Sequence, residues 1–424
     1  MPMRKHLLAV AGAGLASVLA ATLIAGCGGS APPPVMAHGV ALREPASDPR
    51  PYATADTAFG LGLLGAWCRA DPQANLVLSP SSLASGLGMA YLGARGGTAQ
   101  AMAATLHLPA ASQSSLEAGL QARSAALRAL AGPGVTLQSS DQVWADPTLH
   151  TAPGYLNAVA TGYGAGVARV PLLSHPDQVI GQIDQSISTA TRGHIPQLLA
   201  PGSLQDTGWV LTDALYLDAA WAAPFQASQT TPGPFTSSAG RSVTAQFMNG
   251  GQYRAVSTGG WTAVWLPYQG DKLGMVALLP PAGAASCTLP TAPALDALSS
   301  ALASDRPGGM IRSVSLPRVN LSGNTDMRDL LSRLGMGVAF TKSADFSGLS
   351  REAAYIGLVQ HAATLQVGEK GTVASAATAV GIVASAGEVM SPVVTFDRPY
   401  LMAVTARDTG EPLFMARVAN PGTH

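Results

Sequence analysis

Few side chains in this sequence stand at the spacings that catalysis or metal binding requires. No two histidines have metal-ligand spacing, because those of the later chain are scattered at His107, His150, His175, His194 and His361. No lysine has a serine three positions before it, and no serine lies in a Gly-x-Ser-x-Gly sequence, so the motifs of penicillin-recognising enzymes and α/β-hydrolases are absent. We therefore expect no metal and no cofactor, and we expect a protein that is not an enzyme.

The charge balance argues against whole classes of partner. The chain has 24 basic and 24 acidic side chains, so no overall field attracts nucleic acid or an anionic membrane. With 47% apolar and 11% charged residues it should bury a large core. No linker or repeat divides the chain after residue 51, so we expect a single, monomeric domain over residues 52–424.

Residues 1–27 have the features of an export signal. Arg4 and Lys5 precede an apolar stretch, which ends in Leu23-Ile24-Ala25-Gly26-Cys27. This ending resembles the lipobox of bacterial lipoproteins, in which the cysteine is acylated. The resemblance implies an exported bacterial lipoprotein with Cys27 as its lipid anchor, and Gly28 favours the outer membrane or cell surface. A plain signal peptide that frees the protein outside the cell and an uncleaved membrane anchor are the alternatives.

The segment after the signal has a composition that does not support a packed core. Residues 28–51 are rich in Pro and Gly and predict an extended tether, so contact with a membrane is expected only through the lipid.

Apart from Cys27, the cysteines are Cys68 and Cys287. A disulfide is permitted outside the cytoplasm, but their distance in sequence says nothing about proximity. We expect two buried free thiols.

Hydrophobic periodicity predicts helices early in the chain and strands later, which indicates an α+β fold. The predicted helices are 55–69, 80–94, 98–106, 113–131, 153–163, 178–191, 293–303 and 325–334. The predicted strands are 135–144, 209–221, 242–258, 261–268, 273–280, 312–319, 358–368, 392–397, 400–406 and 412–418.

Several long segments, in a constant order, are similar to the serpin family. Asn75-Leu76-Val77-Leu78-Ser79-Pro80-Ser81-Ser82 resembles one family motif, and the stretch from Met89 to Thr98 resembles the next. Val210-Leu211-Thr212-Asp213-Ala214-Leu215-Tyr216-Leu217, with Trp221, resembles a long family strand, and further markers end at Leu413-Phe414-Met415-Ala416-Arg417. The resemblance covers the mature chain and implies about nine helices around three β-sheets, with an exposed reactive-centre loop near the C-terminus.

One segment resembles the serpin hinge, from which a strand runs into the reactive loop at about 371–391. It contains Glu369, Lys370, Gly371, Thr372, Ala374, Ala376 and Thr378. A segment that enters a sheet must lay every second side chain on a packed core, and those from Thr372 to Thr378 are all small. No charge or proline occurs from Thr372 to Gly387, although either would oppose insertion. This composition is typical of an inhibitory hinge.

The resemblance implies a mechanism and a partner. A serine or cysteine protease attacks the loop, and the cleaved hinge then inserts as a central strand and traps the acyl-enzyme. Counting along the family's loop gives Ser385 and Ala386 as the reactive bond, with Ala384, Glu388 and Met390 as alternatives for the residue that is cut. The small, apolar surroundings favour elastase-like or subtilisin-like targets. Trypsin-like targets are not expected, because no Lys or Arg occurs between Lys370 and Arg398.

The resemblance also assigns a cluster under the sheet that controls its opening, the shutter. Its residues here are Ser79, Ser82, Asp213 and His361, with Asp213 where the family has Asn. An Asp beside His361 predicts a buried ion pair and an opening that depends on pH. The alternative function is that of a non-inhibitory serpin, acting as an extracellular binding or carrier module.

Overall fold

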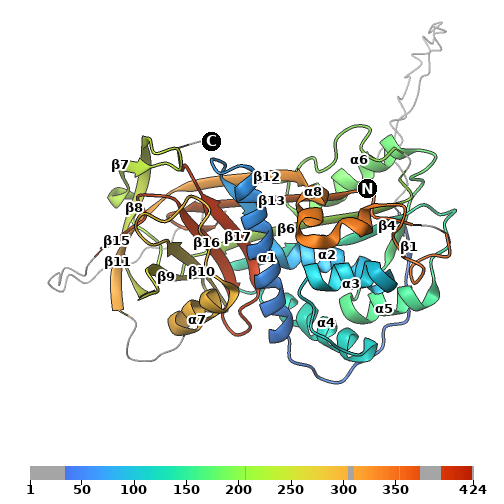
Figure 1. Ribbon diagram of the computed structural model, residues 1–424. Coiled ribbons are helices and arrows are strands. Elements are labelled where there is room, and N and C mark those ends of the chain that lie inside the picture. Colours follow the sequence, from blue (N-terminus) through green and yellow to red (C-terminus); the bar gives the residue numbers. More distant parts are fainter. Residues whose placement is uncertain (1–33, 206, 304–309, 353, 373–392, 423–424) are drawn as a thin grey trace, which may run out of the picture. The chain divides into compact units, whose positions relative to one another are not determined.

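The computed structural model describes residues 34–422, apart from residue 206, 304–309, 353 and 373–392 (Figure 1). The signal, Cys27 and Gly28 therefore lie outside the described residues. So do hinge residues Ala374, Ala376 and Thr378 and the predicted bond between Ser385 and Ala386. The described chain forms two large sheets with helices packed against them, so the predicted α+β fold is confirmed.

The first sheet, which we call sheet A, contains two residues of the predicted hinge. Its strands lie in the order β1 (Val35–Ala37), β5 (Val167–Arg169), β4 (Gln142–Ala145), β6 (Trp209–Ala220), β14 (Gly371–Thr372), β13 (Val359–Gly368) and β12 (Val319–Asp326), and β3 (Val135–Ser139) also pairs with β6. Two strands distant in sequence, β6 and β13, are thus neighbours at its centre. The two-residue strand β14 lies between them at one end.

The second sheet combines two of the three sheets that we expected. Its order is β15 (Val393–Thr395), β11 (Met310–Pro317), β8 (Ser242–Thr258), β9 (Trp261–Pro267), β10 (Leu273–Leu279), β16 (Tyr400–Ala406), β17 (Pro412–Val418) and β2 (Leu76–Leu78), with β7 (Thr231–Thr236) beside β8. The long strand β8 joins the two parts, because its first residues pair with β7 and its last with β9. Between them, Gly250 and Gly251 have φ of 117° and 71°, a backbone that glycine adopts readily.

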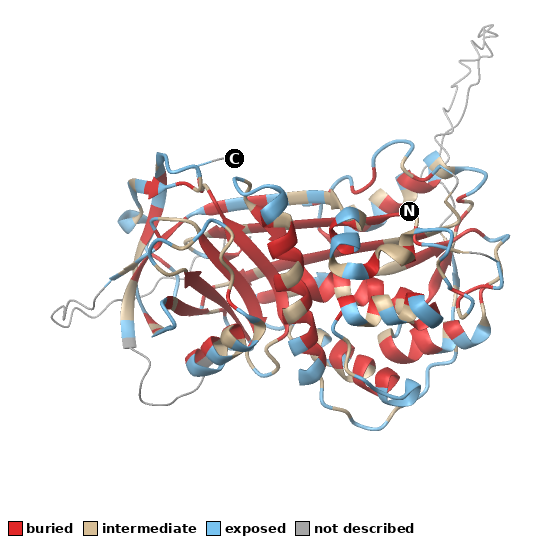
Figure 2. Ribbon diagram, viewed as in Figure 1, coloured by how far each residue is buried: buried red, intermediate tan, exposed pale blue. Residues whose placement is uncertain are grey.

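Helices cover both faces of sheet A. The described residues form α1 (Arg50–Ala70), α2 (Pro80–Gly93), α3 (Gly96–Thr105), α4 (Gln113–Arg128), α5 (Pro153–Tyr163), α6 (Pro176–Ala190), α7 (Ala292–Ala303) and α8 (Arg328–Leu331), close to the nine expected. On one face, α6 packs Ile183 and Ile187 with Ala214 and Ala362 of the central strands. On the other face, α2 contributes to the largest core (Figure 2). None of the described helices has the length and apolar character to cross a bilayer.

Two predicted elements were wrong in detail. The strand expected over 135–144 is interrupted after Ser139, so β3 and β4 are separate strands with Asp141 between them. The helix expected over 325–334 begins later, because residues 325 and 326 complete the ladder between β12 and β13. Pairing with a neighbouring strand overrides local helix preference there.

The predicted tether is shorter than expected. Residues 35–37 pair antiparallel with β5 at the edge of sheet A. Beyond them, the Val40 N–H donates to Asn157 Oδ1 at 2.8 Å and the Leu42 N–H to Thr161 Oγ1 at 3.0 Å, both acceptors being on α5. Helix α1 already begins at Arg50. The domain therefore starts before Tyr52, and the tether prediction is wrong for these residues.

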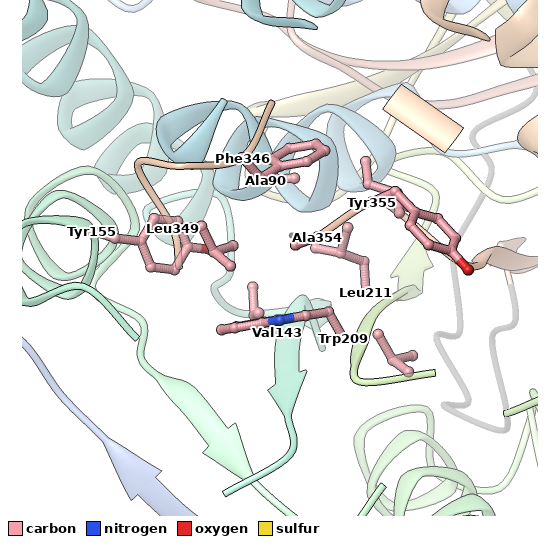
Figure 3. A pocket seen from close by; sticks show the side chains of 11 residues that line it. Ala90, Val143, Tyr155, Trp209, Leu211, Phe346, Leu349, Ala354 and Tyr355 are labelled. Atoms are coloured by element: carbon pink, nitrogen blue, oxygen red, sulfur yellow. The ribbon is translucent and has the colours of Figure 1, made fainter. Parts of the chain in front are cut away.

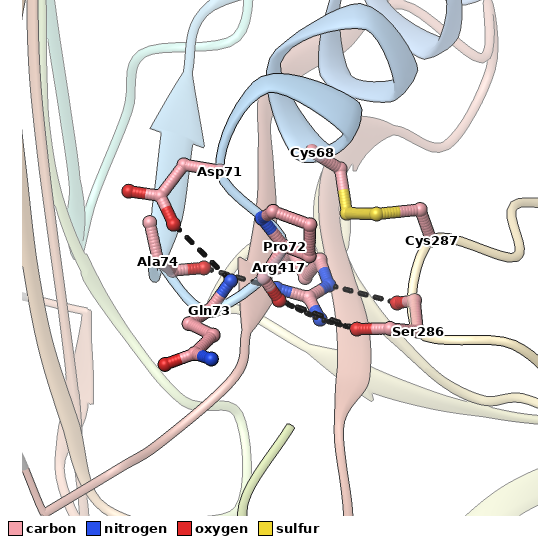
Figure 4. Close-up of a disulfide and its surroundings, with 8 residues drawn as sticks. All are labelled: Cys68, Asp71, Pro72, Gln73, Ala74, Ser286, Cys287 and Arg417. Carbon is pink, nitrogen blue, oxygen red and sulfur yellow. Dashed lines mark hydrogen bonds between the residues drawn. A yellow bond between two sulfur atoms is a disulfide. The ribbon is translucent and has the colours of Figure 1, made fainter. Parts of the chain in front are cut away.

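The prediction of free thiols was also wrong. Cys68 at the end of α1 forms a disulfide with Cys287, and the two lie 219 residues apart in sequence (Figure 4). The buried guanidinium of Arg417 ties the same two segments, donating to the carbonyl oxygens of Pro72 and Ala74 on one side and of Ser286 on the other. The fold of β17 brings these segments together, which sequence separation does not reveal.

Candidate functional site

The site is a seam between β6 and β13 in the middle of sheet A. The two strands pair with each other only at one end, where Val359–Ala362 run parallel to Leu211–Ala214. At the other end β14 lies between them and pairs antiparallel with both. Between these ends, residues 215–218 and 363–366 are described and form no ladder with each other. The seam thus has the edges that a further strand would need.

Gly371 and Thr372 already occupy this seam. Gly371 has φ of 150°, and a Cβ there would lie 2.1 Å from the carbonyl oxygen of Ala219, so only glycine fits. The Thr372 side chain is fully buried on the core face, with its hydroxyl 2.5 Å from that of Tyr268. Tyr268 in turn stacks on Trp221, with ring centroids 4.5 Å apart. Gly371 and Thr372, two residues of the predicted hinge, are therefore packed as a strand.

The turn before β14 is held by polar contacts. Glu369 accepts hydrogen bonds from Arg318 Nε at 2.7 Å and Thr230 Oγ1 at 2.6 Å. Burial opposes ionisation of Glu369, but these hydrogen bonds outweigh it and lower the pKa of the carboxyl. Trp221 donates its backbone N–H to Lys370 O and its indole N–H to Gly368 O, each at 2.9 Å. The start of the predicted hinge is thus held by contacts with Trp221 on one side and with Thr230 and Arg318 on the other.

The residues predicted for the shutter lie together under the paired end of the seam. His361 on β13 and Asp213 on β6 are opposite each other in the ladder, and Nδ1 of His361 lies 2.6 Å from Oδ1 of Asp213. The backbone N–H of Ser79 donates to Nε2 of His361 at 3.1 Å. Ser79 also caps α2, its hydroxyl accepting from the Ser82 N–H at 3.2 Å.

These contacts determine the protonation of His361. Because Nε2 accepts a hydrogen bond from a backbone N–H, it carries no proton, and the ring is neutral with its proton on Nδ1. Nδ1–H then donates to Asp213. The expected ion pair is therefore a hydrogen bond between a neutral imidazole and a carboxylate. Asp213 Oδ2 is buried and has no hydrogen-bond partner among the described residues.

The sequence did not point to one residue of this cluster, Asp141. Asp141, between β3 and β4, accepts from Ser82 Oγ at 2.8 Å and from Ser139 Oγ at 2.5 Å. Burial and the charge of Asp213 raise the pKa of Asp141 to about 7, although both serine hydrogen bonds act in the opposite direction. The available signal was an acidic residue in the middle of a strand-like segment, which disfavours strand.

A small apolar cavity lies at the foot of the seam, beyond its paired end (Figure 3). Its volume is about 30 Å³. Val143, Trp209 and Leu211 line it from β4 and β6, and Leu349 and Ile356 line it from the segment that leads into β13. The cavity therefore lies between the strands on the β6 side of the seam and the segment that leads into β13. The described chain contains no cluster of side chains that could hold a metal ion.

Comparisons with known proteins match this architecture. A family model described as Serpin (serine protease inhibitor) matches residues 54–421. The leukocyte elastase inhibitor of Sus scrofa is 29% identical over 378 residues, covering 87% of this chain and 99% of that protein. The solved structure of tengpin, a thermophilic serpin in the native state, is similar with a TM-score of 0.77 and 22% identity, covering 91% of this chain and 97% of that one. A thyroxine-binding globulin in complex with thyroxine has a TM-score of 0.74 at 22% identity, covering 88% and 99%.

Proposed function

The chain belongs to the serpin family, and from this premise we propose that it is a suicide-substrate inhibitor of serine endopeptidases, with cysteine endopeptidases as a second target class. The observation that carries the proposal is β14, because two hinge residues already form a strand inside the seam. The similarity to a leukocyte elastase inhibitor supports the same role. The chain itself is not an enzyme in this proposal, since the protease supplies the nucleophile.

The chemical step is an acyl transfer that stops at the acyl-enzyme. The protease serine attacks the carbonyl carbon of Ser385, the peptide bond to Ala386 breaks, and the new amine leaves with a proton. An ester then joins Ser385 to the protease. Insertion of the cut hinge into sheet A pulls the ester away from its oxyanion donors, and loss of one such donor slows a protease about 10²- to 10³-fold. Hydrolysis of the ester then stalls.

The register of β14 supports insertion of the whole hinge. Thr372 pairs with Ala219 of β6 and Val367 of β13, and both pairings are antiparallel. Continued in the same register, residues 374, 376 and 378 come opposite 217, 215 and 213 on β6. Their side chains would face the core as that of Thr372 does. Ala374, Ala376 and Thr378 are small enough to enter there without overpacking.

The same register brings Thr378 between Asp213 and His361. Insertion must separate these two residues, which bond each other in the uncut protein. The hydroxyl of Thr378 can donate to Asp213 and accept from His361 Nδ1–H, so neither buried group loses its partner. Together with about a dozen new backbone hydrogen bonds, at ~0.5–1.5 kcal/mol each, insertion would release on the order of 10 kcal/mol.

The target class follows from the predicted bond. Ile382, Val383 and Ala384 before Ser385 favour elastase-like or subtilisin-like proteases with shallow pockets. The test incubates the full chain with an elastase, a subtilisin and a trypsin, and examines each mixture on a denaturing gel. A covalent adduct with either of the first two, and a released peptide that begins at Ala386, are expected. If the protease cleaves every molecule of the protein and remains active, the inhibitory function is contradicted.

A carrier function is the alternative that this experiment must separate. The fold likeness to a thyroxine-binding globulin does not distinguish the two functions, because inhibitors and carriers share it. The small, uncharged hinge favours the inhibitor. Cleavage of the loop should raise the melting temperature of an inhibitor strongly, because insertion adds a central strand. A melting temperature that cleavage leaves unchanged would favour the carrier.

We also propose that the protein is an exported lipoprotein, anchored through Cys27 on the outer membrane or cell surface and acting as a monomer. The disulfide between Cys68 and Cys287 supports an oxidising location. Radiolabelled palmitate should label the full chain in a bacterial host, and Cys27→Ser should remove the label. Secretion of an unlabelled, shortened chain would instead support a plain signal peptide, and an unlabelled, full-length membrane protein an uncleaved anchor.

A further inference from the structure

Half of the large apolar side chains that the described chain exposes lie in one short segment. Of eight such side chains, four are Val35, Met36, Val40 and Leu42, which are between 37% and 71% exposed. We call these four residues the apolar edge, because β1 is the outermost strand of sheet A. Monomeric proteins seldom gather exposed apolar side chains in one place unless that surface contacts a partner. The apolar edge is therefore a candidate contact surface.

The backbone of this segment is bound to the domain, which leaves the side chains on the outside. Gly39 lies so close to α5 that a Cβ there would meet the carbonyl carbon of Leu156 at 2.2 Å. The N–H groups of Val40 and Leu42 donate to side chains of α5. The carbonyl oxygen of Leu42 accepts from Gln121 Nε2 on α4 at 2.9 Å. The domain thus holds the apolar edge in place while its side chains stay exposed.

The chain that leads to the apolar edge is uncharged. No Asp, Glu, Lys or Arg occurs between Lys5 and Arg43, so a mature chain that starts at Cys27 would begin with a charge-free segment over residues 27–42. Moving a charged side chain out of water is costly, and this segment has none to move. Proteins that rest on a bilayer insert exposed apolar side chains about 5–10 Å into the boundary between headgroups and acyl chains. The composition of the segment suits that environment.

The proposed lipid anchor lies within a short reach of the apolar edge. Seven residue steps separate Cys27 from Pro34, the first described residue, and a fully extended chain spans at most about 25 Å over them. The headgroup layer takes up about 5–8 Å of that reach. Helix α1 alone, with 21 residues, is about 31 Å long. The part of the domain next to Pro34 must therefore stay near the bilayer, and its contact with lipid becomes an intramolecular event of high effective concentration.

A second copy of the chain fits this surface less well. Strand β1 has only three residues, and the backbone after it packs on α5, so the open edge offers few groups for pairing with another strand. A stable dimer needs about 800 Å² of surface from each partner, which is more than four side chains at one edge provide. A bilayer requires neither a strand partner nor a matching shape. The observations therefore favour lipid as the occupant.

We propose that the apolar edge is a membrane-contact surface, which docks the domain on the bilayer that holds Cys27. This inference rests on the proposed lipid anchor and is independent of inhibition. Figure 1 shows β1 and β15 at opposite ends of the described domain. The predicted bond precedes β15 in the sequence. Docking through the apolar edge would therefore turn the β15 end of the domain away from the membrane, where a protease can approach it.

A fluorescent label at residue 41 tests the contact in the full, lipidated chain. Ala41 is exposed in the middle of the apolar edge, so Ala41→Cys adds a thiol and keeps the four apolar residues. Cys68 and Cys287 form a disulfide and Cys27 would be acylated, so the label attaches to the new thiol. The protein is placed in vesicles of phosphatidylethanolamine and phosphatidylglycerol whose acyl chains carry a nitroxide quencher. The label should lose most of its fluorescence there, compared with vesicles that have no quencher.

A label at residue 239 is the matched control. Ala239 is also exposed, and it lies in the turn between β7 and β8, at the other end of the domain from β1 (Figure 1). The label on Ala239→Cys should keep its fluorescence in the same vesicles. Equal quenching at both positions, or quenching at neither, would overturn the contact.

Two sets of substitutions separate the contact from the effect of a short tether. Replacing Val35, Val40 and Leu42 together by serine should restore most of the fluorescence at the label in the apolar edge, while the lipid keeps the chain in the membrane fraction. Replacing Ile311 and Val393 by serine is the control, because these exposed apolar residues lie on β11 and β15, and it should change nothing. Unchanged quenching after the first set would show that the tether alone brings the label to the lipid, and the proposal would fail.

Three further readouts distinguish the possible failures. Palmitate labelling reports the anchor, and an unlabelled chain would reject the anchor and this contact together. Self-quenching between labels at residue 41, relieved by dilution with unlabelled protein, would identify a second copy as the occupant and overturn the contact with lipid. Adduct formation with elastase reports inhibition and depends on neither the anchor nor the apolar edge.

Discussion

His361 and Asp213 stand opposite each other in the ladder between β13 and β6, and a 2.6 Å hydrogen bond joins their side chains. The bond crosses the boundary that a new strand must open. It is also fully buried, so neither group can exchange its partner for water while the sheet is closed. Insertion would therefore require a replacement hydrogen-bond partner for both groups. The register of β14, continued along the seam, would bring Thr378 to that position.

Thr378→Val should weaken the cleaved protein and leave the uncut one unchanged. Valine has the same shape as threonine but no hydroxyl, so Asp213 and His361 would remain buried without a bridge after insertion. The free energy of unfolding of the cleaved form should fall by about 1–3 kcal/mol. Denaturant melts of both forms measure this. Ser375→Ala, on the opposite face in the same register, is the control. Equal losses for the two variants would contradict the proposed register.

Gly371→Ala should damage inhibition. An added Cβ would meet the Ala219 carbonyl oxygen at 2.1 Å, so β14 must leave the seam. We expect more moles of inhibitor to be cleaved for each protease trapped, because insertion would start without Gly371 and Thr372 in place. Titration of elastase activity measures this ratio. Gly368→Ala is the control, because a Cβ there meets nothing within 4 Å. An unchanged ratio in Gly371→Ala would show that β14 is dispensable.

Val143→Ile should slow insertion by filling the cavity at the foot of the seam. One added methylene suits a space of about 30 Å³ and should stabilise the closed form by about 0.8 kcal/mol. The rate at which the intact protein takes up a synthetic peptide with the sequence of residues 372–385 should fall several-fold at constant pH. Val167→Ile, at a buried neighbour outside the cavity lining, should destabilise by overpacking. Faster uptake in Val143→Ile would contradict a role for this cavity in holding the two sides together.

Loss of the disulfide should destabilise the uncut protein without abolishing its fold. Replacing Cys68 and Cys287 by serine together should lower the free energy of unfolding by about 2–5 kcal/mol, since the bridge closes a long loop. The contacts of Arg417 should still hold the two segments near each other. Denaturant melts with and without reductant measure the effect. Reductant should shift the unchanged protein and leave the double variant unaffected.

The sequence predicted best those features that depend on local pattern. Isoleucines at helical spacing located α6, and they do face the sheet. The resemblance to the serpin hinge pointed to the segment from Glu369 to Thr378, and Gly371 and Thr372 of this segment lie in the seam. Pairing between distant segments was beyond such reasoning. The disulfide, the strand at residues 35–37 and the position of Asp141 beside Ser82 all depend on contacts over more than fifty residues, which no local pattern encodes.

If the hinge inserts as proposed, the uneven pairing along the seam would divide insertion into two phases. A hinge that continues from Thr372 would first meet residues 215–218 and 363–366. The facing edges of these two segments are not bonded to each other, so the hinge could pair with both without breaking an existing strand pairing. After that, the hinge would have to break the ladder between residues 211–214 and 359–362. The early phase would start insertion, and the late phase, at the ladder that contains His361, would be the slower one. In this protein the decision between releasing and capturing a protease would therefore be made halfway down the sheet.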